Sequence, residues 1–86
     1  MVCDLISPER NIKVENVNYV KVPGTKGSFG ILKKHAPIVS SLEPGAVKVI
    51  LDDKTKLLFA IPSGGFVEVT DDQVTIIAEE VLQQPE

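Results

Sequence analysis

The sequence predicts an all-β domain, built as a sandwich or a barrel, on three observations. The 86 residues are 43% hydrophobic with no tryptophan, one tyrosine and three phenylalanines, so valine, isoleucine and leucine must form the core. Branched side chains of this kind pack well on a pleated sheet. Turn residues recur about every 8 to 12 positions, which is typical of sandwiches and barrels. Only AEEVLQQ, residues 78–84, looks helical, and it is too short for an independent helix.

The length allows one domain, because a chain of this size buries only about 60 to 65% of its unfolded surface. We expect a single domain over residues 1–86, with its core at about residues 2–80 and a short tail at residues 81–86. The chain shows no repeat, linker or low-complexity tract.

The N-terminal elements begin with VCDLI, residues 2–6, a β-prone run that ends at the Ser-Pro-Glu turn of residues 7–9, where proline removes a backbone donor. In residues 12–22 the apolar positions change from one alternating frame to the other and back. A slip of one residue reverses the two faces of a strand. We therefore expect two short strands joined near residues 15–16.

The segment GTKGSFGILKKHAPIVS, residues 24–40, holds three of the six glycines and the only histidine. Residues 27–32 can be extended, and IVSSLE after the His-Ala-Pro corner is another short strand. A Glu-Pro-Gly turn leads to the plainest hairpin, which is AVKVIL, DDKT and KLLFAI. Two further turns, PSGG and TDD, separate that hairpin from FVEV and FVEV from QVTIIA.

The apolar pattern of the C-terminal half bears on function. One alternating frame supplies the expected core: Val47, Val49, Leu51, Leu57, Phe59, Ile61, Val67, Val69, Val74 and Ile76. The opposite frame should be mostly polar in an isolated sandwich, yet it holds Ile50, Leu58, Phe66 and Ile77. One interpretation is that strand bends turn some of these inward. The other is that a second protein covers an apolar outer face.

The charge distribution excludes a general nucleic-acid binder, because such proteins need a net basic face and this chain carries −3. Residues 1–43 carry six basic and four acidic side chains, a net of +2, whereas residues 44–86 carry three and eight, a net of −5. Such asymmetry is typical of solvated surface, and it also allows one end to meet an acidic partner.

The cysteine and histidine counts exclude a disulfide and a His/Cys zinc site, since there is one of each. A reducing compartment fits this usage. The first four residues lack the basic and apolar regions of a signal peptide, and no run is long enough to span a membrane. We expect a soluble, cytosolic chain.

No enzyme constellation is present. Ser40 and Ser41 follow His35 by five and six residues, without an elbow motif or an orienting carboxylate. The three glycines of residues 24–30 precede no Gly-Lys-Ser/Thr and no long helix, so they do not form a phosphate-binding loop. We predict no catalytic, metal or cofactor residues. His35 is better explained as a structural corner residue than as a ligand or base.

Lys54 supports an alternative function. It stands at a hairpin tip in DDKT, which is where a lipoyl or biotinyl carrier domain presents its modified lysine. Turn polarity explains the same lysine equally well.

A set of collinear segments carries a family resemblance: VCDLISPE at the start, GSFGIL before the HAP corner, LEPGAVKV, and PSGGFVEVTDDQVTIIAEE ending at Glu80. The chain resembles the N-terminal domain of the epsilon subunit of rotary F-type ATP synthases, called delta in mitochondria. The resemblance implies a ten-stranded antiparallel β-sandwich at the foot of the central stalk, bound to the gamma subunit and resting on the c-subunit ring.

The resemblance also implies a non-catalytic rotor subunit without a cofactor. It would help couple proton-driven rotation to ATP synthesis at the cytoplasmic face of a bacterial inner membrane. By position, the c-ring-facing residues would be Ser7, Ser28, Phe29, His35 and Ala36. The gamma-facing residues would be Ser40 and Leu42. The lysines Lys26, Lys33 and Lys34 fit a place near ring loops and lipid headgroups, where exposed charges steer orientation.

The chain departs from most bacterial family members at its C-terminus. These continue with a helical hairpin that can inhibit ATP hydrolysis, whereas this sequence stops at Glu86. We expect no C-terminal helical domain here. Either the chain resembles the short epsilon forms that lack the inhibitory switch, or it is a truncated piece whose missing half could still inhibit.

Overall fold

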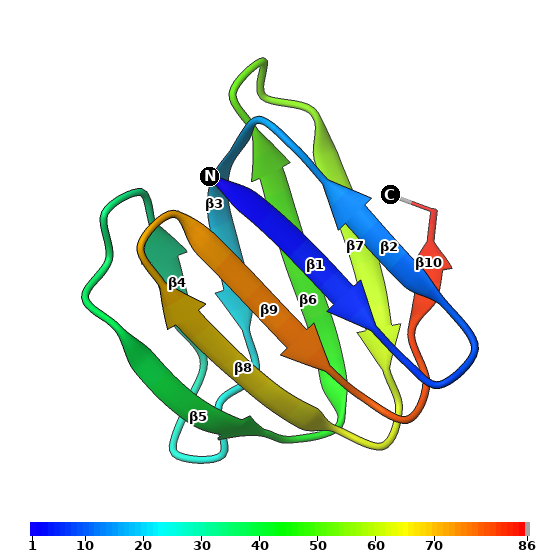
Figure 1. Cartoon of the computed structure of the whole chain (residues 1–86). Coiled ribbons are helices and arrows are strands. Elements are labelled where there is room, and N and C mark those ends of the chain that lie inside the picture. Colours follow the sequence, from blue (N-terminus) through cyan, green and yellow to red (C-terminus); the bar gives the residue numbers. More distant parts are fainter. Residues whose placement is uncertain (86) are drawn as a thin grey trace.

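The computed structural model describes residues 1–85 and shows two five-stranded sheets packed face to face (Figure 1). The front sheet has the order β2 (Asn11–Val14), β1 (Val2–Ile6), β9 (Gln73–Ile77), β8 (Gly65–Thr70) and β5 (Ile38–Leu42). The back sheet has the order β10 (Leu82–Gln84), β7 (Lys56–Ile61), β6 (Gly45–Leu51), β3 (Val17–Val22) and β4 (Phe29–Leu32). The fold is therefore a β-sandwich, as expected, and not a closed barrel.

The strand boundaries follow the turn residues of the sequence. β2 and β3 are separate, and Asn16 between them has a left-handed φ of 58°, a conformation that asparagine tolerates better than most residues. β6 and β7 form the expected antiparallel hairpin, which runs from Gly45 opposite Ile61 to Ile50 opposite Lys56. The predictions of two short strands near residues 15–16 and of this hairpin are confirmed.

One strand pair differs from the expected antiparallel arrangement. β1 pairs with β9 in parallel, from Val2 opposite Gln73 to Ile6 opposite Ile77. No short turn joins these strands, so no hairpin sets their relative direction. Within this pair the register places Cys3 and Leu5 inward, and both side chains are fully buried between the sheets.

The helical prediction for residues 78–84 is wrong. Val81 is buried in the core at 3% exposure, and the next three residues form the edge strand β10, with Leu82 opposite Ala60 of β7. Residues this few gain more from the unpaired backbone groups of β7 than from one turn of helix. The sandwich thus continues to Gln84, beyond the boundary expected at residue 80, while Glu86 lies outside the described residues.

The core lies between the sheets and is apolar throughout the described residues. Eight of the ten residues expected to point inward are buried, and Leu51 and Leu57 are partly buried against them. In the opposite frame Ile50 and Leu58 are half-buried, but Phe66 and Ile77 remain 58% and 51% exposed. Strand bends therefore do not turn Phe66 and Ile77 inward.

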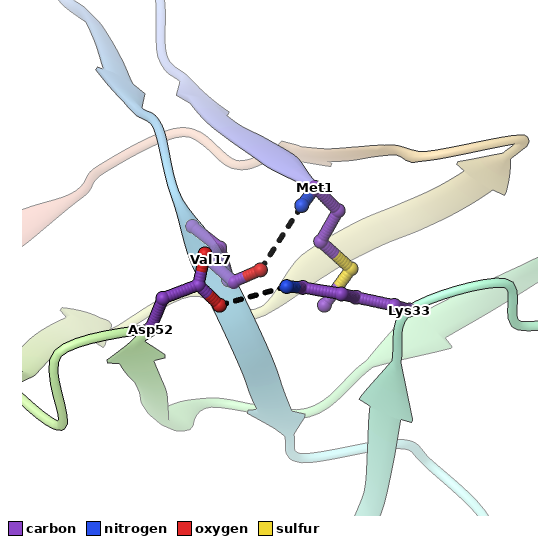
Figure 2. A network of polar contacts seen from close by, with 4 residues as sticks. All are labelled: Met1, Val17, Lys33 and Asp52. Atoms are coloured by element: carbon purple, nitrogen blue, oxygen red, sulfur yellow. Dashed lines mark hydrogen bonds and ion pairs between the residues drawn. The ribbon is translucent and has the colours of Figure 1, made fainter.

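Polar contacts join the loops at the end of the sandwich that holds the N-terminus (Figure 2). The amino group of Met1 donates to the carbonyl oxygen of Val17 at 3.0 Å, and the Val17 N–H donates back to the Met1 carbonyl at 2.9 Å. Lys33 Nζ lies 2.8 Å from a carboxylate oxygen of Asp52, whose N–H donates to Asn16. The ion pair is half-exposed, so it contributes at most about 1 kcal/mol.

Candidate interaction surface

An apolar groove lies on the outer face of the front sheet. Phe66 of β8 and Ile77 of β9 sit directly opposite each other there, and Ile77 is in turn opposite Ile6 of β1. Together with neighbouring loops they enclose about 600 Å³. Its apolar lining residues are Ile6, Pro8, Leu42, Phe66, Ile77 and Ala78. Its other lining residues are Ser7, Ser41, Ser63, Gly64, Gly65 and Glu79.

Two glycines bring the β7–β8 turn close to the groove. Gly64 has a left-handed φ of 71°, and a side chain there would collide with the carbonyl oxygen of Leu42. A side chain on Gly65 would collide with the carbonyl oxygen of Ile77. The Ser-Gly-Gly sequence is thus a packing requirement, because only glycine permits this approach of backbone to backbone.

A second hollow of about 370 Å³ adjoins β5, the outermost strand of the front sheet, and is lined in part by Phe29 and Ser40. The loop between β3 and β4 forms one wall and is tied to β5 by hydrogen bonds. The Thr25 N–H donates to the Ser41 carbonyl at 3.1 Å, and the hydroxyls of these two residues lie 2.9 Å apart. This loop therefore connects the two sheets at one corner.

The residues assigned by resemblance to two partners are not gathered into two surfaces. Ser7 and Leu42 line the apolar groove, although Leu42 is only 5% exposed and belongs to the core. Phe29 and Ser40 line the second hollow, close to Ser28 in the chain. One predicted ring residue and one predicted gamma residue thus share each cavity.

His35 and Ala36 lie beyond the far end of β4. His35 lines a separate hollow of about 430 Å³ with Lys34, Pro37, Asp71 and Asp72. Its Nδ1 lies 2.7 Å from the carbonyl oxygen of Ala36. Phe29 begins β4, whereas His35 follows the turn after its end, where the His35 N–H donates to the Leu32 carbonyl at 3.2 Å. The predicted ring-facing residues therefore extend from one end of the sandwich to the other, and their role remains a prediction.

The three lysines grouped by the sequence do not form one cluster. Lys26 is exposed in the β3–β4 loop, whereas Lys33 and Lys34 follow β4 at its other end. Lys33 is also engaged with Asp52. β4 separates these positions because an extended strand places its ends far apart, which sequence proximity conceals.

Lys54 is exposed in the β6–β7 turn at a left-handed φ of 73°. Its N–H donates to the Leu51 carbonyl at 2.9 Å, and the Thr55 N–H donates to an Asp53 carboxylate oxygen at 2.9 Å. Hydrogen bonds from Thr55, from its side chain first and then from its backbone, lower the pKa of Asp53. These hydrogen bonds within the turn explain why polar residues occupy DDKT.

Cys3 is fully buried in β1. Burial, together with a smaller contribution from the neighbouring Asp4 carboxylate, raises the pKa of its thiol to about 12. Within residues 1–85 no group of three or more histidine, cysteine and acidic residues is placed to hold a metal ion. No helix in this part of the chain is long and apolar enough to cross a bilayer.

Comparison with known proteins decides the family. Residues 1–84 match the model of the ATP synthase delta/epsilon chain β-sandwich domain. The chain belongs to this family. The ATP synthase epsilon chain of Maricaulis maris is 49% identical over 79 residues, which cover 92% of this chain and 58% of that relative. The epsilon chain of Desulfitobacterium hafniense is 43% identical over 75 residues, covering 87% and 55%. The chain therefore spans a little over half the length of these delta/epsilon relatives.

Two solved structures agree with the fold. A chain in the cryo-EM structure of the Euglena gracilis mitochondrial ATP synthase OSCP/F1/c-ring assembly matches with a TM-score of 0.86 and 28% identity, over 94% of this chain and 51% of its own length. A chain in the Tetrahymena thermophila mitochondrial ATP synthase central stalk and c-ring structure matches with a TM-score of 0.80 over 95% of this chain and 65% of its own. At 19% identity this second match supports the fold alone.

The site residues predicted from the sequence did not include the groove residues Phe66, Ile77, Pro8 and Ala78. A signal existed for Phe66 and Ile77, which occupy the outward frame where polar residues were expected. Nothing comparable marked Pro8 and Ala78, because these reach the groove only when separate turns of the sandwich come together.

Proposed function

We propose that this chain is a non-catalytic rotor subunit of the central stalk of a rotary F-type ATP synthase. It docks the gamma subunit to the c-subunit ring and helps couple ion-driven rotation to ATP synthesis at other subunits. Membership of the delta/epsilon family supports this function. So does the structural likeness to a chain of an ATP synthase assembly that includes the c-ring.

The apolar groove is the observation that carries the proposal. Phe66 and Ile77 are both more than half exposed, directly opposite each other and continuous with Ile6, Pro8 and Ala78. Contiguous exposed apolar surface of this kind marks interaction sites in soluble proteins. We assign the groove to the gamma subunit, because buried aromatic and aliphatic anchors dominate the binding energy of stable interfaces.

The contact with the c-ring is assigned to residues in loops and at strand ends. The predicted set Ser7, Ser28, Phe29, His35 and Ala36 lies in loops or at strand ends and is mostly exposed or half-buried. Exposed polar contacts set orientation more than they add affinity. In this arrangement the chain is attached to the cytoplasmic face of a bacterial inner membrane through the complex.

Association with a gamma-containing catalytic core tests the proposal. The purified chain should co-elute with a core containing cognate gamma on gel filtration, and a core without gamma should leave it in the free fraction. Failure to associate with any cognate gamma would overturn the assignment. A binding surface elsewhere would appear as association that survives substitution of the groove residues.

A further inference from the structure

The outer face of the back sheet carries a charge opposite to that of the whole chain. Its five strands contain Lys21, Lys48 and Lys56 but no aspartate or glutamate. All three lysines are exposed, and within residues 1–85 no carboxylate pairs with any of them. On a chain of net charge −3 this face is thus a local basic surface.

Strand register concentrates these charges. Lys21 of β3 lies directly opposite Lys48 of β6. Lys56 of β7 lies opposite Ile50, which is two residues beyond Lys48 on the same face. Like charges directly opposite each other destabilise a sheet, so the Lys21–Lys48 pair is unfavourable in the isolated chain.

Apolar side chains surround the lysines on the same face. Tyr19, Ile50 and Leu58 are half-buried among them, while Leu32 and Leu82 are 58% and 40% exposed at the two edges of the sheet. A small hollow of about 190 Å³ is lined by Lys48, Lys56, Leu57 and Leu58. The face therefore combines a central group of cations with apolar contact area, on the side of the sandwich opposite the apolar groove.

We propose that this basic face binds an acidic amphipathic helix of a partner protein. Along β6 and β7, successive residues on one face are about 6.8 Å apart. Lys21 and Lys48 form one row across the strands, and Lys56 lies in the next row, at that spacing. Carboxylates at positions i and i+4 of a helix are separated by about 6.0 Å along its axis, so two acidic residues match two lysine rows. Leucines beside them contact Ile50 and Leu58.

An acidic helix fits the basic face better than a second copy of the chain or an anionic lipid surface does. A second copy of the chain supplies no helix from residues 1–85, so it lacks the required spacing of carboxylates. Anionic lipid would satisfy the lysines but offers no fixed spacing, and the half-buried Ile50 and Leu58 do not protrude into a bilayer. The inference is independent of the gamma assignment, because it concerns the opposite face of the sandwich.

A peptide probe tests the proposal with the whole chain. The probe is a labelled helical peptide of about 14 residues, with glutamates at i and i+4 beside a leucine stripe. The control peptide has the same composition with its glutamates on opposite faces. Fluorescence anisotropy should show binding of the probe only, weakening with added salt because exposed charges are screened. Backbone amide NMR shifts should lie in β3, β6, β7 and β10.

Charge-reversal variants identify the face. Lys21→Glu/Lys48→Glu should weaken binding of the probe by about tenfold or more. Lys13→Glu/Lys54→Glu has the same net charge change at positions off this face and should leave affinity within about twofold. If the first variant fails to fold, Lys21→Gln/Lys48→Gln replaces it.

Four results would overturn the inference. These are no binding of the probe, an equal loss in both variants, NMR shifts on the front sheet, and lysine-dependent binding to phosphatidylglycerol vesicles that exceeds binding to the probe.

Discussion

Replacing Phe66 with serine should remove much of the affinity for the gamma-containing core without unfolding the sandwich. A phenylalanine side chain buries about 200 Å² when it is fully covered. Phe66 is 58% exposed, so a partner filling the groove would cover roughly 115 Å² of it. At about 25 cal/mol per Å² this is about 2.9 kcal/mol, which corresponds to a roughly hundredfold weaker Kd.

The assay is isothermal titration calorimetry, in which the gamma-containing core is titrated with the unmodified chain and with Phe66→Ser. A control variant changes a side chain of the same exposed fraction on another face. Leu32 is also 58% exposed but lies on the outer face of the back sheet, so Leu32→Ser should leave affinity for the core unchanged. Urea unfolding should show that each variant keeps its stability within about 1 kcal/mol, because both side chains are mostly outside the core. Equal affinity of Phe66→Ser and the unmodified chain would refute the groove as the gamma site.

Three further predictions follow from buried and loop residues. Cys3 should resist iodoacetamide at pH 8 in the folded chain, because its thiol has a pKa of about 12. Since the unfolded thiol ionises near 9, its contribution to stability is complete below that pH. It should then fall by about 1.4 kcal/mol per pH unit toward 12, measured against Cys3→Ala by urea unfolding; equal slopes would contradict this. Gly65→Val should cost about 2 kcal/mol in the same measurement, because its side chain meets Ile77 and Ala78, and an unchanged midpoint would show that the turn can relax. His35→Glu should reduce proton-coupled ATP synthesis in membranes while changing stability by less than about 0.5 kcal/mol, and normal synthesis would remove His35 from the ring contact.

Much of the fold was predictable because its signals are local. Turn residues and alternating apolar positions specify β6, β7, β8 and β9 within short windows, and the strands lie where those patterns placed them. The helical prediction for residues 78–84 was wrong because it also relied on local signals alone. AEEVLQQ has helical residues, but its strand depends on a free edge of β7 that no local pattern reveals.

The candidate site shows the same division. The outward frame of Phe66 and Ile77 was visible in the sequence and indicated an apolar outer face. Their joining with Pro8 and Ala78 into one groove was not, because it depends on turns brought together from distant segments. The lysines show the converse, since Lys26 and Lys33 are close in sequence but separated by β4.

By itself the sequence determined the all-β class and the family resemblance, because composition, turns and collinear motifs are written along the chain. Only the tertiary structure decided the parallel pairing of β1 with β9, the strand at residues 82–84 and the two outer faces. These depend on register between strands far apart in sequence. Register places Phe66 beside Ile77 and Lys21 beside Lys48, and no single segment contains that information.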